Sequence, residues 1–298
     1  MPATSANLRR ARALLGTFVE IDVTDAHRCD AENAVEAAFS AVTDVHRLMS
    51  FHDPDSDVSR LNRAASSGVV NVHSWTYAVL KMALDVTHHS DGAFDVAVAG
   101  AGAGRPSVGS TAQADVPQST AIELLADDRV RFRDSAVKID LGGIAKGFAV
   151  DRAIAALQSR GVRSAMVNAG GDLAAFGPDA RIVHIRDPRF PDRLLCQVEV
   201  SNGALASSAR RFDPFRSMET MDTAVVTPST RLPTGVAHGA TVSAPTCMVA
   251  DALTKVVMVA GQQAAAPLAR FQASAMLIAA NGAIHTTPDW QGVHQHAA

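Results

Sequence analysis

The segment that most constrains the fold is KIDLGGIAKGFAVDRAIAAL, residues 138–157 of this 298-residue chain. It opens with alternating polar and apolar residues up to Asp140, and two glycines follow Leu141. From Ile144 onward, apolar residues recur at the spacing of one helix face until Gly161, which suits a left-handed helix end. The pattern predicts a short strand, a tight glycine turn and a helix in direct succession.

This turn puts a carboxylate, two glycines and a lysine at the mouth of the helix. Gly142 and Gly143 permit either close approach of a ligand to the backbone or a positive φ. The first amides of a helix lack partners within it and attract anions, and Lys146 adds a positive charge in the first turn. The spacing differs from that of a Walker loop. The segment fits a phosphate site, and it also fits a plain strand-to-helix connection with an exposed lysine.

Composition argues against several other classes of protein. Hydrophobic residues make up 47% of the chain and charged residues 19%, which supports a large core and argues against disorder. A formal net charge of −3 with 5% aromatic residues gives no basis for binding nucleic acid. The three cysteines, at positions 29, 196 and 247, suggest neither a zinc site nor a disulfide framework. No apolar run reaches the roughly 18 residues of a transmembrane helix.

The remaining chain alternates between strand-like and helix-like patterns. A loop rich in Gly, Ser, Ala and Pro at 101–119 is interpreted as a surface excursion within one domain. Residues 51–62 and 203–245 are expected to be irregular. We expect helices at 30–50, 75–89, 119–126, 144–161 and 248–261, strands at 14–23, 129–133, 136–140, 163–169, 180–186 and 195–201, and a hairpin at 272–287.

Three further segments place chemically active side chains beside apolar runs. SDGAFDVAVAG sets Phe94 and Asp95 after a glycine, either as a ledge for a ligand or as an anchor in the core. NAGGDLAAFG is a second glycine turn after a strand. In VADALTK, Asp251 and Thr254 share one helix face, and such oxygen ligands suit Mg²⁺, although a capped or salt-linked surface helix gives the same pattern.

Taken in order, LLGTFVEI, MSFHDPDSDVSRLN, DGAFDVAV, IDLGGIAKGFAVD, VNAGGDL and VADALTK resemble the ApbE family, the FAD:protein FMN transferases. The resemblance covers roughly residues 10 to 262. It implies an ApbE-like α/β (α+β) fold of mixed sheets flanked by helices, with room for two lobes around a flavin cleft. We expect a single domain over residues 10–285, with 1–9 and 286–298 as flexible tails.

The resemblance also implies a reaction. Enzymes of this family bind FAD with Mg²⁺, transfer the FMN moiety to a Ser or Thr hydroxyl of a partner flavoprotein and release AMP; some instead hydrolyse FAD to FMN and AMP. Phosphoryl transfer is mostly positioning and charge neutralisation, which a metal on the diphosphate and an amide-rich turn supply. We therefore expect a Mg²⁺-dependent FMN transferase with a target flavoprotein as its partner. A non-catalytic FAD-binding homologue and an FAD hydrolase are the alternatives.

The resemblance assigns roles only to positions that match the family's motifs. The Gly143 carbonyl and Asp251 match metal contacts, and Thr254 is expected to complete the metal site. Asp251 and Lys146 are the expected catalytic residues. The positions that match flavin or nucleotide contacts are Leu15, His52, Ala93, Phe94, Asp95, Asp140 and Lys146.

One departure from the family pattern falls at the expected metal site. The family reads D-A-L-x-T, whereas Lys255 stands here at the Thr position and Thr254 comes one residue earlier. An ammonium cannot ligate Mg²⁺, and its charge opposes the cation. Either Thr254 substitutes as a ligand or Lys255 replaces the metal electrostatically.

Two more departures lie upstream of this helix. The family's H-I-I-D-P-x-T-G segment aligns with AVVTPSTRLPTG, so its His becomes Ala224 and its Asp becomes Thr227. An alanine can serve neither as a base nor as a phosphate contact. The family's T-S-G reads Ser207, Ser208 and Ala209 here. The departures gather in the half that carries metal and catalysis, which is why a non-catalytic FAD binder is kept as an alternative.

The sequence leaves the compartment open. Residues 1–16 are basic but carry no sustained apolar run and no cleavage site, which favours a cytoplasmic protein for the chain as written. Family members are often exported and tethered to membranes. A chain trimmed of its leader would instead be periplasmic and membrane-associated.

Overall fold

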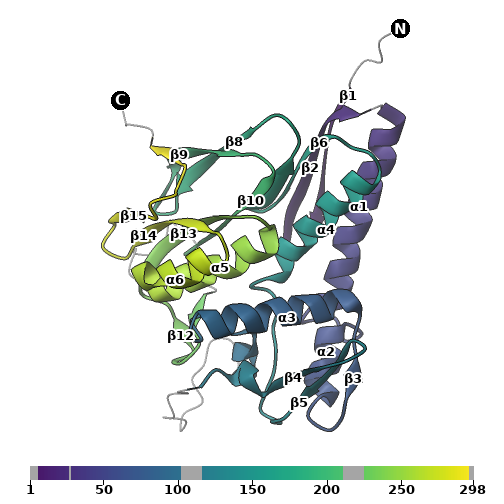
Figure 1. The fold of residues 1–298 in the computed structure, drawn as a ribbon, viewed down its shortest axis with the longest axis vertical. Coiled ribbons are helices and arrows are strands. Elements are labelled where there is room, and N and C mark those ends of the chain that lie inside the picture. The colour runs from purple at the N-terminus through teal and green to yellow at the C-terminus, as the bar shows by residue number, and fades with distance from the viewer. Residues whose placement is uncertain (1–5, 27, 102–115, 211–224, 295–298) are drawn as a thin grey trace.

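The computed structural model describes residues 6–26, 28–101, 116–210 and 225–294 (Figure 1). Its main element is an eight-stranded sheet with the order β1-β2-β6-β7-β10-β13-β14-β15. Neighbouring strands are antiparallel throughout, because connections such as 15–16 and 170–171 are too short for a parallel crossover. The strands are β1 (Ala6–Leu14), β2 (Thr17–Ala26), β6 (Ser164–Ala169), β7 (Asp172–Phe176), β10 (Gly203–Ala209), β13 (Ala237–Ala244), β14 (Ser274–Ala279) and β15 (Ile284–Thr286).

Helices cover one face of this sheet. α4 contacts both α1 and α5, and fully buried side chains such as Phe39, Leu157 and Leu253 belong to the core cluster on this side. No helix among the described residues is long and apolar enough to cross a membrane. The helices are α1 (Arg28–Met49), α4 (Ala145–Ser159), α5 (Cys247–Ala260) and α6 (Ala265–Arg270), with a 3₁₀ turn at Gly261–Ala264.

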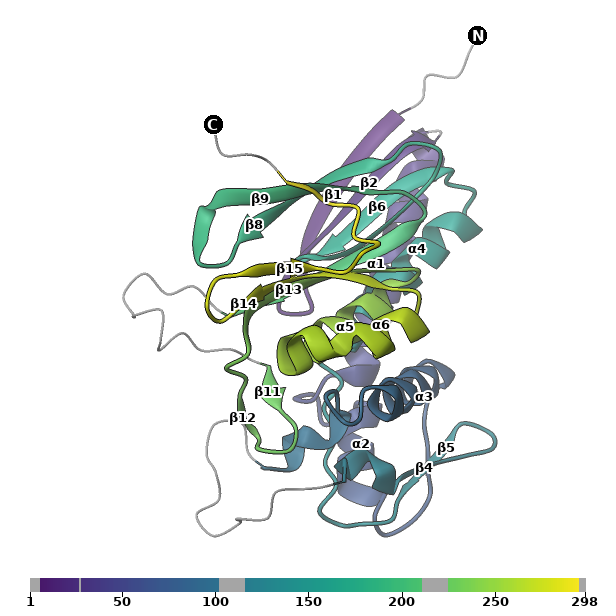
Figure 2. The ribbon, with the colours of Figure 1, turned by 60° about the vertical axis from the view of Figure 1, so that its left-hand side comes forward.

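A smaller antiparallel sheet, with the order β16-β9-β8, covers the opposite face, as Figure 2 shows. Leu195 of β9 belongs to the same apolar cluster as Leu173 of β7 and Leu205 of β10. Successive side chains of a strand alternate between faces, so Ala174 belongs to the helix-side cluster. The small sheet consists of β8 (Arg181–Asp187), β9 (Phe190–Val200) and β16 (Val293–His294).

A third group of elements lies at the lower end of the molecule in Figure 1. α3 (Ser74–His89) packs against α5 and α6, and a three-stranded sheet has the order β3-β5-β4. The predicted α/β (α+β) class, with helices packed outside the sheets, is confirmed; the two-lobe arrangement stays a prediction. The other elements are α2 (Asp57–Ala64), β3 (Val70–Asn71), β4 (Ile122–Leu125), β5 (Arg129–Phe132), β11 (Val226–Thr227), β12 (Leu232–Pro233) and 3₁₀ turns at Val96–Ala101 and Gln118–Ala121.

The structure corrects two expectations in this third group. Residues 51–62 contain the start of α2, because the Ser56 hydroxyl caps the helix by accepting a hydrogen bond from Ser59 N (3.0 Å). Residues 119–126 are not an α-helix: a short 3₁₀ helix over Gln118–Ala121 is followed by β4, which pairs with β5. Pairing with a distant strand overrides the local helical pattern there.

The strand expected to deliver Asp140 is also wrong, because residues 136–140 have no regular structure. The Ile139 amide donates to Asn62 Oδ1 (2.8 Å), and the Asp140 amide donates to the Val96 carbonyl (2.8 Å). A side chain and a loop carbonyl therefore satisfy the backbone in place of a neighbouring strand. These contacts still position the glycine turn directly before the start of α4.

Several strands are missed or misplaced by the sequence patterns. β10 and β13, within the supposedly irregular 203–245, pair with each other inside the large sheet. Their sequences, GALASSA and AHGATVSA, are poor in the large β-branched residues that indicate strands. The strand expected at 14–23 is broken by the turn at 15–16, and β7 was not expected.

Residues 6–9 and 293–294, in the segments expected as tails, pair in strands. The sheets expected to be mixed are antiparallel within the described residues.

Candidate functional site

A cleft of about 460 Å³ is walled by segments that are far apart in the sequence. They come from the GAFD segment, the glycine turn, strand β10, the start of β11 and helix α5. Among the residues predicted to contact a ligand, the cleft brings together Ala93, Phe94, Asp95, Asp140, Gly143 and Lys146.

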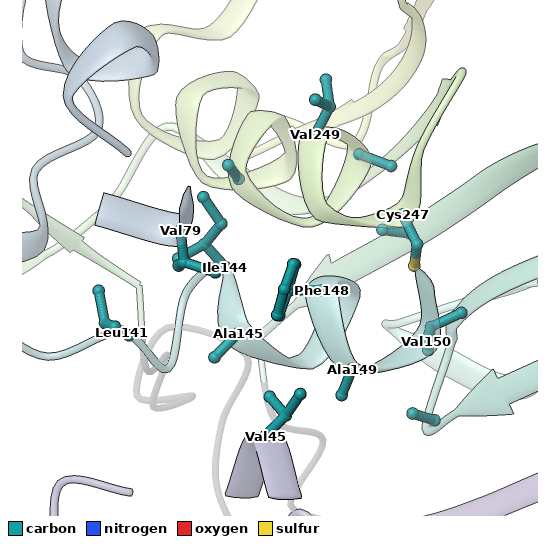
Figure 3. Packing of buried hydrophobic residues seen from close by; sticks show 14 of the residues in the cluster. Val45, Val79, Leu141, Ile144, Ala145, Phe148, Ala149, Val150, Cys247 and Val249 are labelled. Atoms are coloured by element: carbon teal, nitrogen blue, oxygen red, sulfur yellow. The ribbon is translucent and has the colours of Figure 1, made fainter. Parts of the chain in front are cut away.

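Helix α4 carries the glycine turn, and its packing fixes the position of that turn. Figure 3 shows Phe148 pointing from α4 toward α5, while Ala145 faces Val45 of α1. The Leu141 carbonyl closes the turn by accepting hydrogen bonds from Ile144 N (3.0 Å) and from the Ala145 amide (2.8 Å). Buried packing on both sides therefore holds the start of α4 against the cleft.

The two glycines of the turn keep the cleft open. Neither has a positive φ, so backbone conformation does not require glycine at these positions. A Cβ atom on Gly143 would lie 3.4 Å from the Phe94 ring and 3.7 Å from Lys255 Cε. A Cβ atom on Gly142 would lie 3.2 Å from Asp140 Oδ1. The bare backbone at position 143 thus leaves space between an aromatic ring and a cation.

Helices α4 and α5 cap each other with aspartates. Gly147 lets them approach, because a Cβ there would lie 2.8 Å from Asp251 Cβ and closer still to the Cys247 carbonyl. The Gly147 amide, in the first turn of α4, donates to Asp251 Oδ2 (3.0 Å). Asp151 of α4 in turn accepts hydrogen bonds from the amides of Cys247 (2.8 Å) and Met248 (2.9 Å) at the start of α5. The positive end of each helix therefore faces a carboxylate of the other.

Three amides at the start of α4 are engaged by acceptors within the protein, and the phosphate site suggested by the sequence stays a prediction. Those of Ile144 and Ala145 donate to Leu141, and that of Gly147 donates to Asp251. An anion that enters the cleft would meet the side chains at its wall rather than these three amides.

Four charged side chains form one group at the cleft, the charge cluster of Lys146, Asp172, Asp251 and Lys255. Lys146 Nζ donates to Asp172 Oδ2. Lys255 Nζ donates to Asp251 Oδ1 and, at 3.0 Å, to the Asp251 carbonyl. Both carboxylates are fully buried, whereas the side chains of Lys146 and Lys255 are 34% and 16% exposed. Of the four residues, the two lysines line the cleft.

In the Lys146–Asp172 pair, the carboxylate of Asp172 is only partly hydrogen-bonded. Burial and the charge of Asp251 raise the pKa of Asp172 to about 6, despite the two nearby lysines. The described residues provide no hydrogen-bond partner for Asp172 Oδ1, which is buried. Burial lowers the pKa of Lys146, but the charges of Asp172 and Asp251 outweigh it, so the net shift is upward. Lys146 therefore remains an ammonium at neutral pH.

At two of the three residues predicted to hold magnesium, Asp251 and Thr254, oxygen atoms are already engaged in hydrogen bonds. Asp251 Oδ1 and its carbonyl accept from Lys255, while Thr254 Oγ1 donates to the same carbonyl (2.7 Å) and pairs with Ser208 Oγ (2.8 Å). A divalent ion at these oxygens would stand beside an ammonium group. No group of three or more His, Cys, Asp or Glu within the described ranges could hold a metal. The residues around Asp251 do not fit a divalent cation; the Gly143–Asp251–Thr254 metal site stays a prediction, which this geometry disfavours.

Other predicted residues lie apart from the cleft wall. Leu15 has a positive φ of 56° in the turn between β1 and β2 and packs on the core, and His52 is exposed with its ring 5.5 Å from that of Phe51. Neither is among the residues that line the cleft, and their flavin contacts stay predictions. Thr227 lies in β11, while Ala224 falls outside the described residues.

Asp95 has a structural role in addition to its place at the cleft. Its carboxylate accepts hydrogen bonds from Ala97 N (2.8 Å) and from Ser119 N (3.4 Å). These contacts tie the GAFD segment to the 3₁₀ turn at Gln118–Ala121 and so fix where Phe94 stands.

Sequence reasoning missed parts of the site. Ser207 and Ser208, noted in the sequence only as a departure from the family's T-S-G, line the cleft from β10, a strand that the patterns did not indicate. Asp151 was not singled out, although its position four residues after Gly147 puts both on one face of α4. The pairing of Lys146 with Asp172 joins residues 26 apart in the sequence, and no local pattern signals it.

Comparisons with known proteins agree on one group of relatives. The family model described as the ApbE family matches residues 15–278. A FAD:protein FMN transferase of Treponema pallidum is 28% identical over 187 residues, which cover 56% of this chain and 51% of that protein. A FAD:protein FMN transferase of Vibrio cholerae is 29% identical over 239 residues, which cover 74% of this chain and 71% of that protein. The crystal structure of an ApbE protein from Thermotoga maritima superposes with a TM-score of 0.84 at 26% identity, covering 95% of this chain and 97% of that one.

Proposed function

The chain belongs to the ApbE family, and on this premise we propose that it transfers the FMN part of FAD to a Ser or Thr hydroxyl of a target flavoprotein and releases AMP. One observation carries the proposal: the cleft joins an apolar wall to two lysines. Phe94, Val96 and Val226 offer an aromatic and aliphatic surface for a flat ring system. Lys146 and Lys255 offer positive charge for a diphosphate.

The reaction makes one bond and breaks one. The acceptor hydroxyl oxygen bonds to the phosphorus of the FMN part, and the bond from that phosphorus to the bridging oxygen breaks. The bridging oxygen leaves with AMP, and the hydroxyl proton passes to water or to the leaving phosphate. Because such transfer depends on positioning and charge neutralisation, two ammonium groups beside the diphosphate meet its main requirement.

The residues predicted to be catalytic divide into two roles. Lys146 lines the cleft, so it keeps its predicted contact with the substrate in this proposal. Asp251 is fully buried and holds both Lys255 and the Gly147 amide. It therefore acts as a positioning residue. The magnesium dependence predicted from the resemblance is not carried into the proposal, because Lys255 donates to Asp251 Oδ1, a carboxylate oxygen of the predicted metal ligand.

An assay with two readouts tests the proposed function. Purified protein is incubated with FAD and a candidate flavoprotein domain, in one series with Mg²⁺ and in another with a chelator. We expect fluorescent flavin on the acceptor in a denaturing gel, together with AMP by chromatography. AMP without labelled acceptor would indicate the hydrolase alternative, and FAD binding without either product would indicate the non-catalytic one; both results would contradict the proposal.

Matched variants make the assay specific for the cleft. Lys146→Ala removes a cleft cation and is expected to lower both products strongly. Lys81→Ala removes an exposed lysine of α3 and is expected to leave both unchanged. Equal rates in the two variants would place the reaction elsewhere.

A further inference from the structure

We propose that the Lys255 ammonium is the built-in cation of this cleft and takes the place of a divalent metal in binding FAD. The proposal rests on FAD as the ligand named in the proposed function, and it does not depend on the transfer reaction. Its consequence is a FAD site that works in the absence of any metal ion.

The position of Lys255 Nζ supports this replacement. The nitrogen donates to Asp251 Oδ1, a carboxylate oxygen of the predicted metal ligand, and to the Asp251 carbonyl (3.0 Å). Lys255 is one helical turn after Asp251 on α5, so the chain itself tethers the cation to its acid. The cation is therefore fixed by covalent structure rather than recruited from solution.

The same nitrogen still has a donor for a ligand. An ammonium group carries three N–H donors, and the two Asp251 oxygens account for two of them. Lys255 also lines the cleft, beside the space left open by Gly143. The third N–H is thus available to a phosphate oxygen in the cleft, as is the ammonium of Lys146.

The burial of Asp251 distinguishes this pair from an ordinary surface salt bridge. Aspartate and lysine four residues apart on an exposed helix are common and contribute little. Here the carboxylate is fully buried, and its other oxygen accepts from Gly147 N (3.0 Å). Removing the cation from a buried carboxylate is strongly unfavourable, so a cation at Asp251 stabilises the site. In this chain Lys255 supplies it.

The balance of charges also supports Lys255 as the cation at Asp251. With Lys255, the charge cluster has two positive and two negative side chains. With threonine at 255, the residue expected from the family pattern, Lys146 alone would face Asp172 and Asp251. That arrangement would have a net negative charge and free oxygens on Asp251, which are the conditions that attract a metal ion. Lys255→Thr should therefore convert the site from metal-independent to metal-requiring.

The choice of lysine is also unusual for this chain. Four of its 27 basic residues are lysines, at positions 81, 138, 146 and 255, and two of these belong to the charge cluster. A lysine presents a compact point charge, whereas arginine presents a broad planar fork. Two of the four lysines of this arginine-rich chain thus place compact positive charges in the charge cluster.

The first test measures FAD affinity by flavin fluorescence on the wild-type protein, stripped of metal and then titrated with a chelator or with Mg²⁺ present. We expect the same dissociation constant in both conditions, within about twofold. A loss of affinity of more than about tenfold in the chelator would overturn the proposal. This measurement uses the unmodified chain, so it does not depend on the folding of any variant.

The second test compares Lys255→Thr with Lys255→Met and with the exposed control Lys81→Thr. The threonine variant should bind FAD weakly in the chelator and recover on addition of Mg²⁺ or Mn²⁺, whereas the methionine variant should bind weakly in both conditions. The control should match the wild type. A threonine variant that binds equally well with and without metal would contradict the replacement, and thermal unfolding of each variant checks its fold.

The third test titrates Mn²⁺ and follows its paramagnetic resonance signal. The wild type should leave the signal of free Mn²⁺ unchanged, and Lys255→Thr should reduce it. Wild-type binding that disappears in Asp251→Asn would show a metal at this carboxylate and would overturn the proposal.

These outcomes separate the proposal from the proposed function. Metal-independent FAD binding without AMP or labelled acceptor would reject the transferase function and leave the role of Lys255 intact. Transfer that occurs only with Mg²⁺, together with chelator-sensitive FAD binding, would support the transferase function and reject the role of Lys255.

Discussion

The two lysine–aspartate pairs of the charge cluster look alike but are built differently. Lys146 and Asp172 come from α4 and β7, and the described residues provide no hydrogen-bond partner for one oxygen of Asp172. Lys255 and Asp251 come from one turn of α5, and both carboxylate oxygens of Asp251 are satisfied, by Lys255 and by Gly147 N. The first pair is open and under-satisfied, whereas the second is closed.

This difference suggests different uses for the two lysines. The pKa of Asp172 is about 6, so this acid tolerates a proton when Lys146 turns toward a ligand. Lys255 cannot leave Asp251 without uncovering a buried charge that also caps α4. We therefore expect Lys146 to respond to the substrate and Lys255 to stay fixed, as a metal would.

Breaking the closed pair should have the largest effect. Asp251→Ala leaves Lys255 without its acid and the Gly147 amide without its acceptor, so we expect a loss of about 3–5 kcal/mol in the free energy of unfolding. Urea denaturation measures it. The exposed Asp55→Ala is the control and should change stability by less than about 0.5 kcal/mol. Similar values for the two variants would show that the closed pair is not structural.

The close approach of α4 to α5 at Gly147 should be the next most sensitive feature. Gly147→Ala places a methyl group against the Cys247 carbonyl and Asp251, and should lower stability by about 1–3 kcal/mol. Gly143→Ala meets only ordinary contacts with Phe94 and Lys255, so stability should hardly change while FAD binding weakens. Thermal unfolding and FAD titration distinguish the two. A Gly147 variant as stable as the Gly143 variant would refute the close packing of α4 on α5.

The open pair is best examined through pH. The pKa of Asp172, raised from 3.8 to about 6, means that the folded state binds its proton more tightly than the unfolded state. The contribution of Asp172 to stability therefore grows as pH falls from about 7 to about 4, and is lost as pH rises through about 6. Relative to Asp172→Asn, the wild type should gain about 1–2 kcal/mol between pH 8 and pH 5.

Urea unfolding of both proteins at the two pH values measures this gain. Asp151, whose pKa burial also raises to about 6, is present in both proteins, so its effect cancels. A difference between the proteins that does not change with pH would contradict the raised pKa of Asp172.

The smallest expected effect concerns the cap of α5. Asp151→Ala removes the acceptor of the Cys247 and Met248 amides and should cost about 1 kcal/mol of stability. Thr246 also caps this helix, accepting from Val249 N (3.4 Å), so part of the cap remains. A loss as large as that of Asp251→Ala would show that the two caps contribute equally to stability, which would contradict the smaller role expected for Asp151.

Local patterns in the sequence account for part of this structure. The helices at α1, α3, α4 and α5 follow from their 3.6-residue period, and the glycine turn with Asp140 and Gly143 follows from its spacing. β10 and β13 could not be predicted, because their small residues show strand character only through pairing with each other. The departure at Lys255 was visible, but its contact with Asp251 Oδ1 depends on the helix and the burial around it.

The pairs across the site were beyond the reach of local patterns. Asp151 caps a helix that begins 96 residues later, and Asp251 accepts from an amide 104 residues earlier. Such contacts depend on how α4 packs on α5, which the close approach at Gly147 allows. The sequence therefore indicated several residues of the cleft wall and Asp251 itself, but not the contacts that Asp151 and Asp251 make.

The central claim is that this chain uses Lys255 where a metal would otherwise stand. Calorimetric titration of FAD into wild-type protein treated with a chelator tests it most directly. We expect saturable binding with the same affinity as in excess Mg²⁺. Binding that vanishes with the chelator and returns with the metal would contradict it.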